Sequence, residues 1–553
     1  MEYALGVDDF KITKTESVYV DKTMILEKIT KSISGTSFLF TRPRRFGKSL
    51  ALSMIDYFFD INKKEYSYLF NDLYVSKNND LIEKYQNKFY VIHLNFKDVQ
   101  SDNYEQQIKG VLSIISDFVY SFHYDMDNLG ERDKIIFNRI KNLTASEQDI
   151  IDIIPIIMNL IKNNLNLDVI VLIDEYDSPI IYSRENGFYN KTISFFRSFY
   201  GKIFKSNINL KYGILTGVTQ IAKESIFSGL NNLINNNILS NENEYFGFVD
   251  EEVKNLLKNS KLKIELDDLK SHYGNYKFGN NIVMNPWSVL SCLQNEGILD
   301  DYWVNTSSNS LLKEIINELK DNDELSNVFY NLIVNKDYYS SINPNIIFSD
   351  LLININNVIS ILVSSGYLTY GDANNNYSYP IFIPNIEIKN IFTREIIERF
   401  LIKKDLLFYS NLSNMIINDE VNNLEKFINE YLLSSFSYYE LNNEKSYQII
   451  VLTLCSIAFN NHLVKSEQNV GKGRCDIIVY PNKEENFGII IETKYSKTKL
   501  SSSRLEALAK KAIIQIEENE YINDLKKMSS KSIYIFGFAF SNGKTKIISK
   551  KIN

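Results

Sequence analysis

A short basic turn near the N-terminus has the residue types of a phosphate-binding loop. It follows the apolar stretch Ser37–Thr41 and precedes a helical pattern over Ser49–Phe59. In a P-loop, backbone N–H groups cradle the phosphates, a lysine bridges the β- and γ-phosphates, and a serine hydroxyl binds Mg²⁺. The sequence therefore predicts a nucleotide site formed by Arg44, Arg45, Phe46, Gly47, Lys48 and Ser49.

The turn departs from the usual P-loop pattern at one position. Arg42 stands where G-x-x-x-x-G-K-[ST] has its first glycine. Because Gly-Lys-Ser is a common tripeptide, a basic turn without function is the alternative explanation. A second element is needed to decide between them.

That second element is a pair of carboxylates at the end of the apolar run Val169–Ile173. We expect Asp174 to hold Mg²⁺ and Glu175 to polarise the attacking water, the division of labour in additional-strand P-loop ATPases. Thr216 ends the next apolar run and is placed to sense the γ-phosphate. Together with Lys48, these residues predict an ATP-hydrolysing site.

A second set of chemically active residues lies near the C-terminus. Asp476 begins one apolar run, and Glu492-Thr493-Lys494 ends the next run after a turn. Strand periodicity places Glu492 and Lys494 on one face, within reach of Asp476 across the hairpin. Carboxylates on adjacent strands with a lysine are typical of a metal-dependent phosphodiesterase, in which Asp476 and Glu492 would bind the metal. A solvated hairpin with charged ends is the alternative interpretation.

An additional carboxylate is available from two places. The helix expected over Ser446–Phe459 is preceded by Glu444, and the strand expected over Leu463–Glu467 ends in Glu467. We favour Glu444. Gln448 follows it in the same helical pattern.

The surrounding pattern indicates an α/β protein. Apolar runs at Ser37–Thr41, Phe89–Leu94, Val169–Ile173 and Lys211–Thr216 alternate with helical patterns, as in a parallel sheet covered on both faces. The Asn-rich stretch 233–237 is interpreted as a loop.

Shorter elements follow. We expect helices over Asp250–Lys258 and Pro286–Asn295, then a helix over Ile346–Ser364 with two short strands after it, compatible with a winged-helix-like module. The last unit is expected to add strands Cys475–Tyr480, Gly488–Thr493 and Ser532–Phe540 and a helix over Ser503–Asn519. The predicted domains are 1–245 (P-loop ATPase), 246–335 (helical lid), 336–405 (winged-helix-like) and 406–553 (C-terminal α/β domain).

Composition narrows the class of protein. The chain has 553 residues, 44% of them hydrophobic, and only three cysteines, which argues against disorder and against a disulfide framework. Without an apolar leader or an 18-residue apolar run, we predict an intracellular protein, cytoplasmic or, in a eukaryote, nuclear, with no membrane contact. The net charge is −7, yet the segment from His462 onward has 17 Lys and Arg against 10 Asp and Glu. A basic C-terminal domain is compatible with nucleic-acid binding.

Several long segments resemble one family, the AAA-ATPase-like proteins that are fused to PD-(D/E)XK nuclease-like domains. The matching segments are YVDKT (19–23), RPRRFGKS (42–49), LIDEYDSPI (172–180), TGVTQIAKESIFSGLNNL (216–233), YFGFVDEEV (245–253), NPWSVL (285–290) and YWVNTS (302–307). The family lacks the first P-loop glycine, so the resemblance makes Arg42 a native residue of this loop.

The resemblance also implies roles that spacing alone does not give. The helix over 507–516 resembles the one that completes PD-(D/E)XK sites, which makes Gln515 the active-site polar residue. Gln220 stands where relatives have a basic residue, and Gln448 where they often have histidine. These two departures put phosphate or partner contact at Gln220, and full nuclease activity, in doubt.

The leading hypothesis is therefore an ATPase, using ATP and Mg²⁺, that controls a nuclease using Mg²⁺ or Mn²⁺. Its expected substrate is nucleic acid, with DNA favoured over RNA, and self-association is left open. One alternative is an ATP-dependent switch or nucleic-acid-binding protein whose nuclease fold is non-catalytic. Another is an NTPase that acts on protein partners.

Overall fold

A computed structural model describes residues 2–122, 129–220, 226–227, 229–241, 244–303, 312, 315, 323–333, 338–345, 354–374, 378–392, 406–435, 444–459, 462–470, 473–481, 487–527 and 532–552. The chain divides into two compact units. The first comprises Met1–Ser307 with Tyr339–Ile388, and the second Ser308–Tyr338 with Lys389–Asn553.

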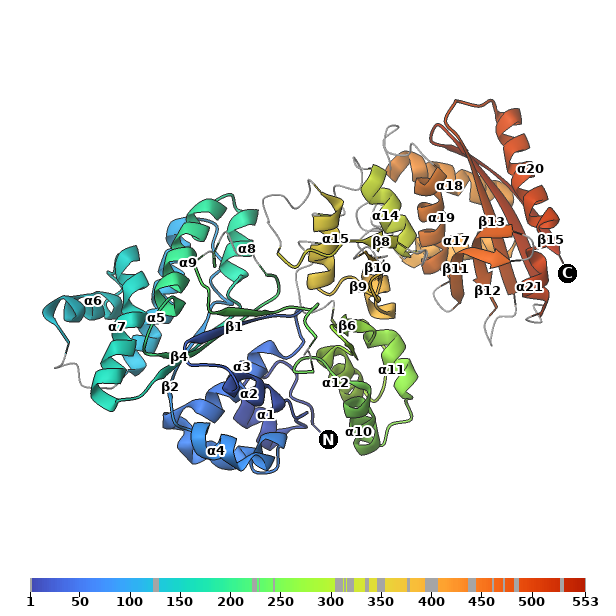
Figure 1. Cartoon of the computed structure of the whole chain (residues 1–553). Coiled ribbons are helices and arrows are strands. Elements are labelled where there is room, and N and C mark those ends of the chain that lie inside the picture. The colour runs from blue at the N-terminus through green and yellow to red at the C-terminus, as the bar shows by residue number, and fades with distance from the viewer. Residues whose placement is uncertain are drawn as a thin grey trace. The chain divides into compact units, whose positions relative to one another are not determined.

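The first unit is built on a parallel five-stranded sheet, as predicted (Figure 1). Its order is β2-β3-β4-β1-β5, so β4 is inserted between β1, which leads into the Gly-Lys-Ser turn, and β3, which ends in Asp174. The strands are β1 (Thr36–Thr41), β2 (Tyr90–Asn95), β3 (Val169–Asp174), β4 (Leu210–Gly217) and β5 (Leu233–Asn236). Every residue of β1 and of β3 is buried, which explains the unbroken apolar runs Phe38–Phe40 and Val169–Ile173 within them.

The interpretation of 233–237 as a loop is wrong. Residues Leu233–Asn236 form β5, which pairs in parallel with Ser37–Phe40 of β1. Strand β5 is short, lies at the edge of the sheet and is rich in asparagine, a residue that is depleted in strands. Tertiary contacts described below outweigh that weak local preference.

Helices cover both faces of this sheet (Figure 1). One face carries α1 (Phe10–Glu16), α2 (Met24–Thr30), α3 (Lys48–Phe59) and α4 (Asn79–Tyr85), with the 3₁₀ segments Ile61–Phe70 and Tyr74–Lys77. The other carries α5 (Tyr104–Ser121), α6 (Glu131–Lys141), α7 (Glu147–Leu165), α8 (Ser178–Glu185) and α9 (Tyr189–Phe204). The apolar core beneath α3 includes Phe38, Phe58 and Ile214, all fully buried.

Smaller elements complete the first unit. The lid region has α10 (Asp250–Ser260), α11 (Leu266–Tyr273), the hairpin β6 (Tyr276–Phe278) and β7 (Asn281–Val283), and α12 (Pro286–Gln294). The middle module has β8 (Tyr338–Ser340), α15 (Ile355–Ser364), β9 (Thr369–Tyr370) and β10 (Tyr379–Phe382), with sheet order β8-β10-β9. Helix α15 and the antiparallel pair β9–β10 match the predicted helix and strands, while 346–353 of the expected helix lie outside the described residues.

The second unit contains a mixed five-stranded sheet of order β11-β12-β13-β14-β15 (Figure 1). Pairing is antiparallel except between β13 and β14. The elements are α14 (Asp323–Ile333), α17 (Leu406–Ile417), α18 (Val421–Ser435), α19 (Glu444–Ala458), β11 (Leu463–Val470), β12 (Gly473–Tyr480), β13 (Phe487–Ser496), α20 (Ser502–Glu518), α21 (Ile522–Lys527), β14 (Ser532–Ser541) and β15 (Lys544–Ile552). The four predicted strands are present. A fifth strand, the lysine-rich β15 at the edge of the sheet, was not predicted.

A buried glutamate ties the middle module to the lid region. The carboxylate of Glu387 accepts hydrogen bonds from Ser288 Oγ at 2.9 Å and from the backbone N–H of Trp303 at 2.7 Å. Burial raises the pKa of Glu387 from 4.5 to about 8. The folded protein therefore holds a proton there that the unfolded chain releases at neutral pH.

This proton makes stability depend on pH. Between pH 4.5 and 8 the folded state binds more protons at Glu387 than the unfolded state, so the free energy of unfolding falls as pH rises, by at most about 1.4 kcal/mol per pH unit. Glu387→Gln keeps an acceptor and should remove this contribution. Thermal unfolding of both proteins is measured from pH 5 to pH 8. The unfolding temperature of the variant should rise relative to that of wild type as the pH increases. The exposed Glu251→Gln is the control, and an unchanged difference across this range would contradict the expectation.

Candidate functional sites

The Gly-Lys-Ser turn lies between β1 and α3. Gly47 caps α3 in the left-handed region at φ 85°, and Arg45 adopts φ 69°. A Cβ on Gly47 would meet nothing within 4 Å, so glycine is favoured there by backbone conformation rather than by space. Such a turn directs backbone N–H groups and the positive end of the helix dipole at one point, which suits phosphate.

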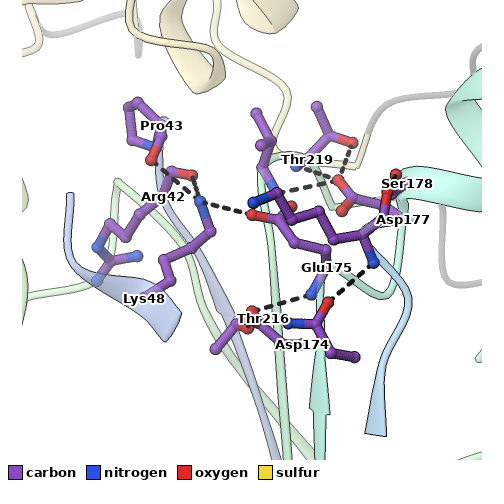
Figure 2. Close-up of polar contacts among 12 residues, drawn as sticks. Arg42, Pro43, Lys48, Asp174, Glu175, Asp177, Ser178, Thr216 and Thr219 are labelled. Atoms are coloured by element: carbon purple, nitrogen blue, oxygen red, sulfur yellow. Dashed lines mark hydrogen bonds and ion pairs between the residues drawn. The ribbon is translucent and has the colours of Figure 1, made fainter. Parts of the chain in front are cut away.

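Lys48 is buried and faces Glu175, the residue directly after β3 (Figure 2). Its Nζ donates to the carbonyl oxygens of Arg42 and Pro43, each at 3.2 Å, and lies 3.7 Å from Glu175 Oε1. Glu175 has φ 50°, a strained conformation for a non-glycine residue.

Asp174 and Thr216 lie side by side at the ends of β3 and β4 (Figure 2). Thr216 Oγ1 donates to Asp174 Oδ1, and Asn95 Nδ2 donates to Asp174 Oδ2 at 3.4 Å. The structure thus brings Lys48, Asp174, Glu175 and Thr216 together. Ser49 follows Lys48 in the first turn of α3 and is half-buried, while Arg44 is exposed.

Arg42 occupies the position of the missing glycine, and its side chain has a structural role. Its guanidinium is completely buried and donates to the carbonyl oxygens of Thr41 and Asn236 at 2.6 and 2.8 Å, and to Asn236 Oδ1 at 2.6 Å. It also lies over the rings of Phe246 and Phe278. Burial lowers the pKa of Arg42 to about 9. Arg42 therefore joins the start of the loop to β5, which explains why the Asn-rich segment forms a strand.

Removing this side chain should destabilise the first unit. Arg42→Ala removes three buried hydrogen bonds from a guanidinium to Thr41 and Asn236, a loss of about 3 kcal/mol or more in unfolding free energy. Chemical denaturation of the full chain should show it, with the exposed neighbour Arg44→Ala as a matched control. Equal stability of the two variants would contradict a structural role for Arg42.

Two further P-loop residues contact the lid region. The Arg45 guanidinium stacks over the Trp287 ring at 4.2 Å, and Phe46 packs edge-on against Tyr276 at 5.0 Å. Gln220, which departs from the family pattern, donates to Asn345 Oδ1 at 2.6 Å and accepts from Asn237 at 3.1 Å. Its amide therefore connects the segment after β4 to the middle module.

The second cluster lies on β12, β13 and α20. Glu492 is almost fully buried, and its Oε1 accepts from Lys494 Nζ at 3.0 Å and from Gln515 Nε2. The Asp476 N–H donates to Glu492 Oε2 at 3.4 Å. The structure therefore brings together Asp476, Glu492, Lys494 and Gln515, four of the five residues predicted for this site.

The ionisable groups of this cluster influence one another. Burial, and then the charge of Asp476, raises the pKa of Glu492 to about 7. Burial also raises the pKa of Asp476 and of Glu444. Burial alone would lower the pKa of Lys494, but Glu492, Asp476 and Glu444 together raise it. The charges of Lys494 and Asp476 therefore act on the carboxyl group of Glu444. The side chain of Glu467 lies outside the described residues.

Two residues that hold Asp476 were not predicted to do so. Thr493, the middle residue of Glu-x-Lys, donates to Asp476 Oδ2 from its backbone N–H at 2.7 Å and from its hydroxyl at 2.6 Å. Gln448 also hydrogen-bonds Asp476. Across the described ranges, no group of three or more His, Cys, Asp or Glu side chains is arranged to hold a metal ion. In the same part of the chain, no helix is both long and apolar enough to cross a membrane.

Comparison with known proteins gives matches at both sites. Residues 4–227 match the family model of predicted AAA-ATPases, and residues 442–550 match a model of the PD-(D/E)XK nuclease superfamily. An uncharacterised protein from the vnfD 5′ region of Azotobacter chroococcum mcd 1 is 24% identical over 408 residues, which cover 72% of this chain and 70% of that protein.

Solved structures show weaker similarity. The Aeropyrum pernix ORC2 protein is 11% identical with a TM-score of 0.26, over 70% of this chain and 98% of that one. The Aeropyrum pernix ORC1 protein in complex with DNA is 9% identical with a TM-score of 0.25, over 69% and 96%. From the family matches, the chain joins a predicted AAA-ATPase region, residues 4–227, to a PD-(D/E)XK nuclease superfamily region, residues 442–550.

Proposed function

We propose that the protein binds and hydrolyses ATP in its first unit and thereby controls metal-dependent cleavage of nucleic acid, with DNA favoured, by its second unit. The observation that carries this proposal is the presence of both residue sets in one chain. Lys48 faces Glu175 at 3.7 Å beside Asp174, and Glu492 is held by Lys494 and Gln515 next to Asp476.

The ATPase residues have distinct tasks in this proposal. The P-loop backbone at Arg44–Gly47 and the Lys48 ammonium bind the phosphates, and Ser49 and Asp174 would hold Mg²⁺, which neutralises phosphate charge. Glu175 orients the attacking water, and Thr216 contacts the γ-phosphate. Lys48 is paired with loop carbonyls and Glu175, and phosphate oxygens would compete for these contacts.

The charge of the second cluster suits a divalent cation. Burial raises the pKa of both carboxylates, the charge of Asp476 raises that of Glu492 further, and a cation beside the two would favour their ionised forms. Such a metal supplies an activated water and stabilises charge on the phosphate. Lys494 orients the water, Gln515 holds Glu492, and Glu444 is the candidate additional carboxylate.

The test is a cleavage assay on the purified full-length chain. Plasmid DNA, single-stranded DNA and RNA are each incubated with Mg²⁺ or Mn²⁺, without nucleotide, with ATP, or with a non-hydrolysable ATP analogue, and ATP turnover is measured in parallel. We expect metal-dependent cleavage whose rate changes with the nucleotide. A cleavage rate that does not change with the nucleotide would overturn the proposed control of cleavage by ATP. The absence of ATP turnover would overturn the ATPase assignment.

A second candidate is a nucleic-acid-binding switch with a non-catalytic nuclease fold. It is favoured by one observation: within the described residues the carboxylates form no three-ligand metal group. Salt-sensitive DNA binding without cleavage in any metal would support this candidate over the first.

A further inference from the structure

A third carboxylate, Asp177, lies beside Asp174 and Glu175 and has no role in the scheme above. It is completely buried at the start of α8 (Figure 2). Its Oδ2 accepts three hydrogen bonds, from the backbone N–H groups of Val218 at 3.0 Å and Thr219 at 2.8 Å and from Thr219 Oγ1 at 2.9 Å. All three donors belong to the turn that follows β4. Asp177 therefore fixes the residues directly after Thr216.

The other oxygen of Asp177 is in a different environment. Within the described part of the chain, Oδ1 has no hydrogen-bond partner although it is buried. It lies against Gly217, where a Cβ would come within 2.5 Å of it and within 2.6 Å of the Tyr176 ring. Only glycine permits this close approach. A buried carboxylate oxygen without a donor is energetically costly, so its presence needs a physical explanation.

The same turn is connected to the two other parts of the ATP site. The Gly217 carbonyl accepts from the Arg42 N–H at 3.0 Å, at the start of the P-loop. Thr216 donates to Asp174. Tyr176 adds a further link, since its hydroxyl donates to the Thr219 carbonyl at 2.7 Å. The turn over 217–219 is thus held by the segment that carries the β3 carboxylates and by the loop that carries Lys48.

We propose that Asp177 is a positioning residue for ATP hydrolysis. It holds the turn 217–219 against the end of β3, so that Thr216 and Glu175 can both act at the same γ-phosphate. This role rests on the proposed ATPase function. It acts through geometry, because the hydrogen bonds of Asp177 go to Val218 and Thr219 of the turn. Burial and the neighbouring charge of Glu175 raise the pKa of Asp177 to about 6, while the Thr219 donors and Lys48 favour its ionised form.

The test compares two substitutions in the full-length chain. Asp177→Ala removes the acceptor, frees the turn, and should lower kcat for ATP about 10²-fold, the effect expected of a misplacement of about 1 Å at a reacting group. The dissociation constant for ATP should stay near that of wild type, because Lys48 and the P-loop backbone are unchanged. Asp177→Asn keeps an acceptor oxygen of the same reach and should restore most of kcat.

A matched control separates positioning from general stability. Asp149 is also a buried carboxylate of the first unit, and it caps α7 by accepting from the Ser146 N–H at 2.9 Å. Asp149→Ala should lower the unfolding temperature without lowering kcat. If Asp177→Ala does not fold, Thr219→Val, which removes one of the three donors, is the milder variant and should lower kcat to a smaller extent.

The outcomes distinguish this inference from the function on which it rests. A wild-type chain that binds ATP without hydrolysing it overturns both. Measurable hydrolysis by wild type, with kcat unchanged in Asp177→Ala or in Thr219→Val, overturns only the role of Asp177. Equal loss in Asp177→Asn and Asp177→Ala would show that charge, not position, matters, and would also overturn the proposal.

Discussion

Lys494→Ala should abolish metal-dependent cleavage of nucleic acid while ATP turnover continues. Lys494 Nζ contacts Glu492 Oε1 at 3.0 Å and is itself half-buried, so its ammonium both balances the carboxylate charge and can orient a water. Groups that orient or activate a reacting water contribute about 10²- to 10⁴-fold to rate. We expect a loss of that size in single-turnover cleavage of plasmid DNA.

The second unit offers a closely matched control for this variant. Lys546 pairs with Glu425 at 3.0 Å, and its side chain is 27% exposed, against 25% for Lys494. Lys546→Ala should cleave at the wild-type rate. Cleavage that survives Lys494→Ala would show that it comes from a contaminant or from another site, and the nuclease assignment would fall.

Lys48→Ala should abolish ATP hydrolysis. The Lys48 ammonium is placed at the head of α3, 3.7 Å from Glu175, where it would balance charge that develops on the phosphates during transfer. Loss of one preorganised donor to a transition-state charge lowers kcat by at least about 10²-fold. Turnover is measured by phosphate release at saturating ATP. If ATP controls cleavage, the variant should also lose the nucleotide dependence of DNA cleavage but not cleavage itself.

A lysine at the opposite end of β3 serves as the control. Lys162 pairs with Asp168 at 2.8 Å, immediately before the strand begins, whereas Asp174 ends it. Lys162→Ala should leave ATP turnover unchanged. Undiminished turnover in Lys48→Ala would mean that phosphate is bound elsewhere, and the assignment of the P-loop would have to be abandoned.

The elements that carry these lysines could be predicted because their signals are local. The runs 38–40 and 169–173 are apolar throughout, and both are buried on the two faces of a parallel sheet. The Gly-Lys-Ser turn and Glu-x-Lys each lie within a few residues of the strand that positions them. Composition and spacing therefore sufficed for the fold class and for the residues at strand ends, whereas the predicted domain boundaries remain predictions.

The features that could not be predicted depend on contacts between residues that are far apart in the sequence. Strand β5 was missed because its asparagines favour loops, whereas its pairing with β1 and the hydrogen bonds from Arg42 to Asn236 hold it in the sheet. Asp177 was visible in the segment 172–180, but its partner Thr219 is 42 residues away. Likewise Thr493 holds Asp476 across a hairpin, although strand periodicity assigns it to the opposite face from Glu492.

The anchoring of Arg42 to Asn236 has a consequence for biosynthesis. The two residues are 194 positions apart, so the loop that precedes Lys48 cannot acquire its native hydrogen bonds until β5 has emerged from the ribosome. At elongation rates of about 5–20 residues per second, that delay is on the order of 10–40 s. During this interval we expect a nascent chain whose P-loop residues are already translated but do not retain ATP. Ribosome-bound chains truncated before and after β5 should therefore differ in nucleotide binding, although both contain Lys48.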